Sequence, residues 1–218
     1  MLSRMHIENY KFSDLSFFSK LVKDYSNHQL PAELQMPYPL SFEGLEQQIQ
    51  SPYPLKIDRK QLVKVIHEQY QSIDVSDAVK SQIDSFQDEN TFCIITAHQL
   101  SLLGGPLYYV IKIANAIALA KKLNADFPEK KFVPVYWMGS EDHDFEEVNH
   151  FYSAEKKIEW KSSQTGAVGP FDTSELKTLT EQIRTLFGIS ERASELISLF
   201  EKSYLKHKDL SAATRYLV

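Results

Sequence analysis

Carboxylates and imidazoles, side chains that can exchange protons, gather in one short stretch of the sequence, residues 141–150. Five acids fall between residues 141 and 147, where there is no lysine or arginine. Such groups can act as general bases near neutral pH or offer ligands to a divalent ion. A solvated charged surface is the alternative, and because the spacing matches neither HExxH nor a facial triad, no residue is assigned to a metal. The candidates for catalysis are Glu141, Asp142, His143 and Asp144, and those for binding are Asn149 and His150.

A second stretch, residues 96–112, combines adjacent glycines with groups that can hold an anion. Pro106, which follows them, is favoured at the start of a helix, where free N–H groups attract phosphate or carboxylate. The pattern is neither GxGxxG nor GxxxxGKS/T, which excludes a dinucleotide fingerprint and a Walker A loop. A tight turn with a solvated lysine is the alternative. The candidates for binding a substrate or nucleotide are His98, Gln99, Gly104, Gly105, Tyr108 and Lys112.

Both stretches follow short apolar runs rich in residues that favour strands. The patterns predict a buried central strand over residues 92–96 and a second, apolar strand over 132–138. A loop over 97–105 and a helix from 106 to about 123 join them. This βαβ order implies parallel strands in an open α/β sheet, which binds ligands beyond the carboxyl ends of its strands. We therefore expect Asp142 and His143 to line a crevice next to the loop that follows the first strand.

The rest of the chain is mainly helical in pattern. We predict helices over residues 14–25, 42–49, 58–87 with a break at 73–76, 173–187 and 190–206, a strand over 157–161 and a turn over 166–170. Residues 29–55 contain five prolines, which disfavour helix, so we expect this stretch to be extended or to wrap another element. The predicted domains are a helical and proline-rich region over 1–90, packing on the core, and a Rossmann-like α/β core over 91–218. This core is expected to be incomplete, because the sequence stops at Val218 inside an apparent helix.

Composition narrows the class of protein. The chain has 218 residues, 43% of them hydrophobic, which is enough to bury a core. The net charge is −5, without the basic excess that binds nucleic acid. No apolar run reaches the roughly 18 residues of a membrane helix, and no signal peptide is evident. Cys93 is the single cysteine, which excludes an internal disulfide, and we expect it to be a core side chain in a cytoplasmic protein.

Two central motifs resemble a known family. The first motif covers residues 94–108, with the sequence IITAHQLSLLGGPLY, and is followed by Lys112. It resembles the TGQQ…GPLY…K segment of the bacillithiol synthase (BshC) family. Residues 132–150 resemble the second signature of that family still more closely, and residues 213–217 resemble a further family segment. The main departure is Ala97-His98, where the family usually has Gly-Gln, although Gln99 is retained.

The resemblance implies a ligase that joins cysteine to glucosaminyl malate in the cytoplasm, giving bacillithiol. It implies an acid or imidazole of residues 141–144 as base, and a loop over 98–105 that holds an anionic substrate or a nucleotide phosphate. ATP or another nucleotide, with Mg²⁺, is a candidate cofactor. Family members are about twice as long and form homodimers through a coiled coil. The alternatives are a metal-dependent hydrolase or nucleotidyltransferase-like enzyme, and a non-catalytic binding fragment.

Overall fold

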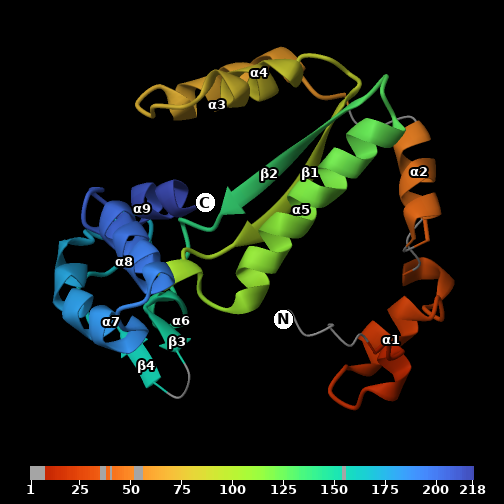
Figure 1. The fold of residues 1–218 in the computed structure, drawn as a ribbon. Coiled ribbons are helices and arrows are strands. Elements are labelled where there is room, and N and C mark those ends of the chain that lie inside the picture. Colours follow the sequence, from red (N-terminus) through yellow and green to blue (C-terminus); the bar gives the residue numbers. More distant parts are fainter. Residues whose placement is uncertain (1–7, 35–37, 40, 52–55, 154–155) are drawn as a thin grey trace. The chain divides into compact units, whose positions relative to one another are not determined.

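A computed structural model describes residues 8–34, 38–39, 41–51, 56–153 and 156–218 (Figure 1). The chain divides into two compact units, residues 1–57 and residues 58–218. The predicted domain division at residue 90 stays a prediction, and several residues of the proline-rich segment 29–55 lie outside the described part. Among the helices that the structure describes, none combines the length and apolar character needed to cross a bilayer.

The first unit contains short helices. They are η1 (Phe12–Asp14), α1 (Lys20–Ser26), η2 (Ala32–Leu34) and α2 (Phe42–Gln50). The side chains of Ser19 and Ser41 accept backbone N–H groups at the starts of α1 and α2. The helix predicted over 42–49 is confirmed. The helix predicted over 14–25 is wrong at its start, because Ser19 rather than Asp14 provides the N-cap.

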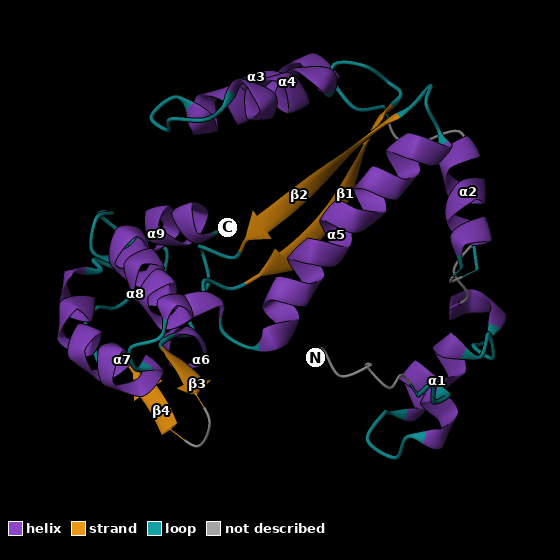
Figure 2. Ribbon diagram, in the orientation of Figure 1, coloured by secondary structure: helices purple, strands orange, loops and turns teal. Residues whose placement is uncertain are grey.

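The strand–helix–strand unit predicted in the middle of the chain is confirmed. Its elements are β1 (Thr91–His98), η3 (Leu102–Gly104), α5 (Leu107–Asp126) and β2 (Lys131–Met138). The two strands pair in parallel, and His98 at the end of β1 lies opposite Met138 at the end of β2. Figure 2 shows α5 running along this pair of strands. The predicted loop over 97–105 is corrected at its start, because β1 continues through His98.

The two faces of this sheet are covered unequally. One face packs against the buried side of α5, which includes Tyr109 and Leu123. On the other face, α3 (Arg59–Tyr70) and α4 (Asp77–Ser85) form an apolar cluster with Val133 near the start of β2. These helices confirm the broken helix predicted over 58–87. Farther along the same face, Ile95 and Trp137 are each 60% exposed.

The prediction that β1 is a buried central strand is therefore wrong. Burial alternates along β1, and Cys93 is exposed rather than part of the core. The physical reason is direction: Cys93 and Ile95 point to the face of the sheet opposite α5, because successive strand residues alternate between faces. In the described residues, the apolar cluster on this face includes Val133 and Val135 of β2, whereas Cys93 and Ile95 of β1 stay exposed.

The second unit has a densely packed half, formed by the described residues between 145 and 218. Its elements are α6 (Phe145–Val148), β3 (His150–Ser153), β4 (Lys156–Glu159), η4 (Ser174–Leu179), α7 (Thr180–Phe187), α8 (Glu191–Tyr204) and α9 (Leu210–Leu217). Phe200, Ile183 and Leu176 are completely buried in one cluster, and Trp160 is 2% exposed. The predicted strand near 157–161 is β4, which pairs with β3, a strand that the sequence did not predict. The helix predicted over 173–187 is divided into η4 and α7.

Candidate functional site

The two loops predicted to carry chemistry begin next to each other, because the strands before them end in register. The N–H of Gly139, directly after β2, donates to the carbonyl oxygen of His98 at 3.0 Å. Gly139 also lies against the backbone of Gln99, since a Cβ there would be 3.6 Å from the Gln99 Cα. The parallel pairing of β1 and β2 thus places both loops at one edge of the sheet.

A glutamine joins the two loops through their side chains. The Gln99 Nε2 donates to Asp142 Oδ2 and to Glu147 Oε2, at 2.7 Å in both cases. An amide nitrogen has two hydrogens and can serve both carboxylates at once, and it cannot accept a proton from either. The amide of Gln99 thus connects the two carboxylates of the acidic stretch to the end of β1. Glu147 belongs to the acidic stretch, but the sequence did not single it out.

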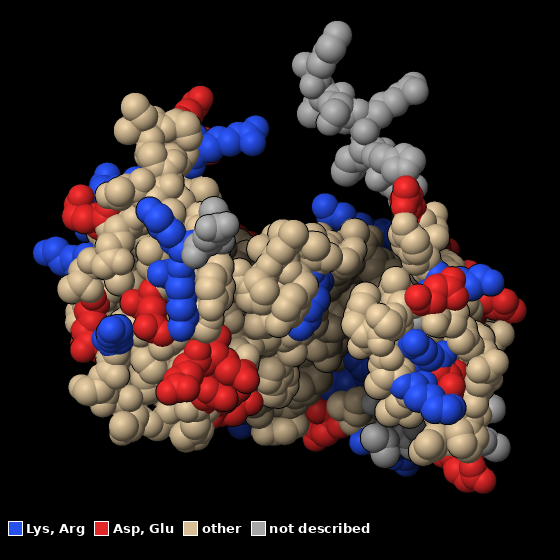
Figure 3. All heavy atoms as spheres, turned by 90° about the horizontal axis from the view of Figure 1, so that it is seen from below, with Lys and Arg blue, Asp and Glu red and all other residues tan. Residues whose placement is uncertain are grey.

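Asp142 is held in its charged form. The hydrogen bond from Gln99, followed by one from the backbone N–H of Asp144, lowers the pKa of the Asp142 carboxyl below its ordinary value. A carboxylate with a lowered pKa is a weak base at neutral pH, but it remains anionic and can attract a cation. In the described residues, no ion pair involves any acid of residues 141–147. Figure 3 shows acidic side chains gathered in a patch on the face seen from below.

The glycine loop has a backbone that other residues adopt with difficulty. Gly104 and Gly105 have φ angles of +80° and +55°, and a Cβ at Gly105 would lie 2.5 Å from the Ser101 Cβ. Leu103 shares the left-handed conformation, at φ 51°, and its N–H donates to the Tyr204 hydroxyl at 2.8 Å. Tyr204 is completely buried in α8, and this burial raises its pKa. The dense half of the molecule therefore holds the loop that precedes α5.

Three more predicted residues gather at the end of β1. The Lys112 ammonium donates to the carbonyl of Ala97 at 2.5 Å and lies 5.7 Å from the centre of the Tyr108 ring. That ring lies 5.3 Å from the ring of His98. The His98 Nδ1 is 3.0 Å from the carbonyl oxygen of Gln99, which can only accept. Nδ1 therefore carries the proton, and Nε2 has a free lone pair in the neutral ring.

The remaining predicted residues are not joined to this group by hydrogen bonds between described side chains. Glu141, His143 and Asp144 are exposed on the acidic loop. Asn149 is buried, and its Oδ1 lies 2.9 Å from the Nδ1 of His150 at the start of β3. The predicted residues thus fall into three sets: those around Gln99, the exposed acidic loop, and the Asn149–His150 pair.

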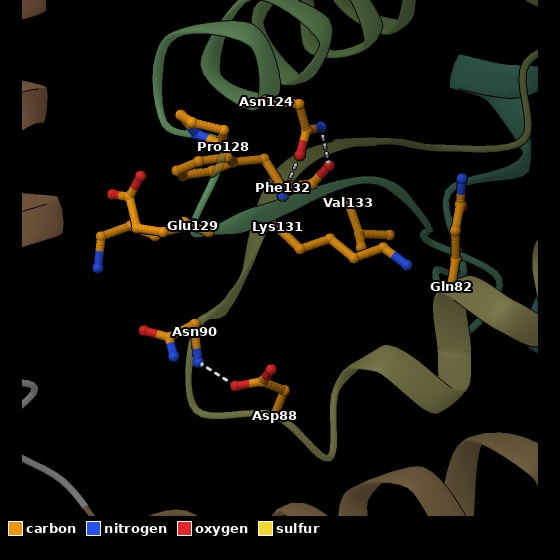
Figure 4. A pocket seen from close by; sticks show the side chains of 10 residues that line it. Gln82, Asp88, Asn90, Asn124, Pro128, Glu129, Lys131, Phe132 and Val133 are labelled. Carbon is orange, nitrogen blue, oxygen red and sulfur yellow. Dashed lines mark hydrogen bonds between the residues drawn. The ribbon is translucent and has the colours of Figure 1, made fainter.

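The opposite edge of the sheet has a hollow of about 500 Å³, shown in Figure 4. Its lining comes from α4, the turn at residues 88–90, the end of α5 and the start of β2. Glu129, Lys130 and Lys131 lie on its wall, and none of the predicted site residues lines it. No group of three or more histidine, cysteine or acidic side chains in the described residues can hold a metal ion.

Comparisons with known proteins agree with the motifs. Residues 5–218 match the model of the family described as bacillithiol biosynthesis BshC, N-terminal Rossmann-like domain. Relatives with the name "Putative cysteine ligase BshC" include those of Flavobacterium johnsoniae (40% identical, 92% of this chain and 38% of the relative), Christiangramia forsetii (43%, 73% and 30%) and Geobacillus thermodenitrificans (31%, 83% and 35%). The family resemblance and the Rossmann-like fold class are confirmed. The chain spans less than two fifths of the length of these relatives.

Proposed function

The chain belongs to the bacillithiol biosynthesis BshC family, as its N-terminal Rossmann-like domain, and from this membership we propose that it supplies the substrate-binding core of a cysteine ligase. The proposed reaction joins the carboxyl group of cysteine to the amine of glucosaminyl malate and gives bacillithiol. Both substrates carry an ammonium group and at least one carboxylate at neutral pH. A site for them must therefore hold opposite charges at separate places.

The observation that carries the proposal is the hydrogen bonding of Gln99 to two carboxylates. Asp142 and Glu147 are held by one amide nitrogen at 2.7 Å each, in a stretch that has no lysine or arginine. Two fixed anions attract a substrate ammonium, and a charge-assisted hydrogen bond to such a group is stronger than a neutral one. We assign Asp142 and Glu147 to the amine of glucosaminyl malate.

The carboxylates of glucosaminyl malate need positively charged or N–H-bearing groups, which lie at the start of α5. The start of α5 offers free N–H groups after the two glycines, and the Lys112 ammonium uses only one of its three hydrogens on Ala97. His98 and Tyr108 line the same approach. This arrangement supports malate binding at residues 98–112, beside the acids rather than on them.

The chemical step needs a proton acceptor. The bound ammonium first loses one proton to solvent, which leaves a nucleophilic amine. The amine nitrogen attacks the activated carboxyl carbon of cysteine, the bond from this carbon to the oxygen of the activating group breaks, and a second proton leaves the nitrogen. Asp142 is a poor acceptor because its pKa is lowered. We assign this proton to His143, an exposed imidazole between Asp142 and Asp144. A nucleotide such as ATP, with Mg²⁺, is the proposed activator, and Glu141, Asn149 and His150 remain binding or catalytic candidates.

Calorimetric titration of the chain with glucosaminyl malate tests the amine site. Asp142→Asn keeps the shape of the side chain but removes its charge, and should weaken binding about tenfold or more, as the loss of a charge-assisted hydrogen bond predicts. Glu129→Gln removes an exposed charge at the opposite edge of the sheet and should leave binding unchanged. The N-acetylated ligand, which has no ammonium, should bind both variants and the wild type equally. Equal binding of glucosaminyl malate to wild type and Asp142→Asn would contradict the proposal.

A non-catalytic binding role is the second candidate, because the chain spans 38% of the length of its Flavobacterium johnsoniae relative. Binding of glucosaminyl malate without turnover in the presence of cysteine, ATP and Mg²⁺ would favour it. We further propose that the complete protein works in the cytoplasm as a homodimer. The single cysteine supports the reducing compartment, and the family resemblance supports the dimer.

A further inference from the structure

The acidic loop is also held from its backbone side, by residues 168–171, which we call the strap. The N–H of Val168 donates to the carbonyl oxygen of Asp142 at 2.8 Å, and the N–H of Gly169 donates to that of Ser140 at 2.9 Å. The strap therefore binds the main chain on both sides of Glu141, whereas Gln99 binds the side chain of Asp142.

The other side of the strap is fixed to the start of α9. The N–H of Ser211 donates to the carbonyl oxygen of Gly169, and the N–H of Leu210 donates to that of Phe171, both at 3.0 Å. Val168 is completely buried, and Phe171 is 4% exposed in the main core. A continuous set of backbone hydrogen bonds thus runs from α9 through the strap to the acidic loop.

Gly169 is the point where these three segments meet. A Cβ there would lie 2.7 Å from the Ser140 carbonyl oxygen and 2.6 Å from the Ser211 Oγ. Both distances are too short for a carbon atom to occupy. The φ angle of Gly169 is not in the left-handed region, so glycine is required here for space rather than for backbone conformation.

We propose that Gly169 is a positioning residue, which lets α9 and the strap set the place of Asp142 for ligand binding. The proposal rests on the proposed function in one respect, that Asp142 is the residue that meets the substrate amine. Gly169 hydrogen-bonds through its backbone to Ser140 and Ser211, and it acts on Asp142 through the backbone of the loop. If the strap moves away, the loop shifts and Asp142 loses its place beside Gln99.

The first test compares Gly169→Ala with Gly188→Ala in the ligand-free chain. Gly188 ends α7 at φ +75° with no atom within 4 Å of an added Cβ, so alanine there strains the backbone but leaves the acidic loop alone. We expect Gly169→Ala to raise the pKa of the Asp142 carboxyl. An NMR titration measures this pKa. Hydrogen exchange of the backbone amides at positions 168 and 169 should become about tenfold faster or more. Gly188→Ala should change neither quantity.

A milder pair of variants decides the question if Gly169→Ala does not fold. Asp209 caps α9 by accepting the N–H of Ala212 at 2.8 Å, and Ser190 caps α8 by accepting that of Ala193 at 3.1 Å. Asp209→Ala should loosen the start of α9 and speed exchange of the Val168 and Gly169 amides, while Ser190→Ala, an equivalent loss of a cap, should not.

Two outcomes overturn the proposal. One is a folded Gly169→Ala chain with the Asp142 pKa and amide exchange of the wild type. The other, where Gly169→Ala is unfolded, is equal exchange in Asp209→Ala and Ser190→Ala. These measurements use no ligand, so they separate failure of the strap from failure of the amine site, which titration with glucosaminyl malate detects. If the strap result is positive and the titration negative, the strap positions a loop with another ligand.

Discussion

The two halves of residues 58–218 differ in how their apolar side chains are covered. In residues 145–218, Phe200 and Ile183 are completely buried. In the β1–α5–β2 unit, Ile95 on the sheet and Leu107 on the helix are 60% and 75% exposed. The densely packed half therefore holds the two loops in place, through Tyr204 and the strap, while the open half provides the strand ends that carry the ligand-binding candidates.

The largest expected effect tests the energetic side of this comparison. Phe200→Ala should lower the free energy of unfolding by about 3–5 kcal/mol, because it leaves a cavity in a closed core. Ile95→Ala should lower it by less than about 1 kcal/mol, because most of the side chain already meets water. Urea unfolding followed by circular dichroism measures both. Equal losses would mean that the open face is packed as tightly as the core.

A smaller effect is expected where the two halves meet, at the glycine loop. Gly105→Ala combines a left-handed φ with a Cβ 2.5 Å from Ser101, and should cost about 2–3 kcal/mol of unfolding free energy. Gly166→Ala has φ +101° with no atom within 4 Å of its Cβ, and should cost about 1 kcal/mol. Thermal or urea unfolding gives the difference. If the two variants lose the same amount, crowding against Ser101 contributes nothing.

Lys112→Ala should change the free energy of unfolding little and the affinity for malate more. The lost hydrogen bond to Ala97 is largely offset by the higher helix propensity of alanine, so the free energy of unfolding should stay within about 0.5 kcal/mol of wild type. Calorimetric affinity for malate should fall about tenfold, as expected when an ammonium leaves an anion site. Unchanged malate affinity would return Lys112 to the role of a solvated lysine that holds the end of β1.

The smallest expected effect is a stability deficit that is present at neutral pH and disappears in acid. Since the Asp142 pKa is lowered in the folded chain, its contribution to stability is complete above the ordinary aspartate pKa of about 3.9, and is lost as the pH falls through the lowered value. Gln99→Met removes the main cause of the shift, so its deficit in unfolding free energy should shrink below about pH 3.9. In an Asp142→Asn background this dependence on pH should vanish. A deficit that is constant with pH would show that Gln99 acts only by packing.

The sequence was sufficient for features that depend on local pattern. Apolar runs, two glycines and Pro106 predicted the βαβ unit, and parallel pairing then predicted that the loops after β1 and β2 would be neighbours. Prediction from the sequence failed for features that depend on contacts between segments far apart in the chain. The exposure of Cys93 depends on what covers the sheet, and the bond from Leu103 to Tyr204 joins residues 101 positions apart. The link from Gln99 to Glu147 depends on side-chain directions that spacing alone does not determine.

The placement of the two tryptophans gives the molecule its own optical probes. Trp160 is 2% exposed, with its indole N–H on Glu175 at 3.1 Å, while Trp137 is 60% exposed and only two positions before Gly139. Fluorescence from Trp160 therefore reports on the integrity of the dense half. Emission and quenching of Trp137 report on what approaches the carboxyl end of β2. Replacing either one with phenylalanine would isolate the signal of the other, so that unfolding and ligand arrival can be followed separately in a single unlabelled chain.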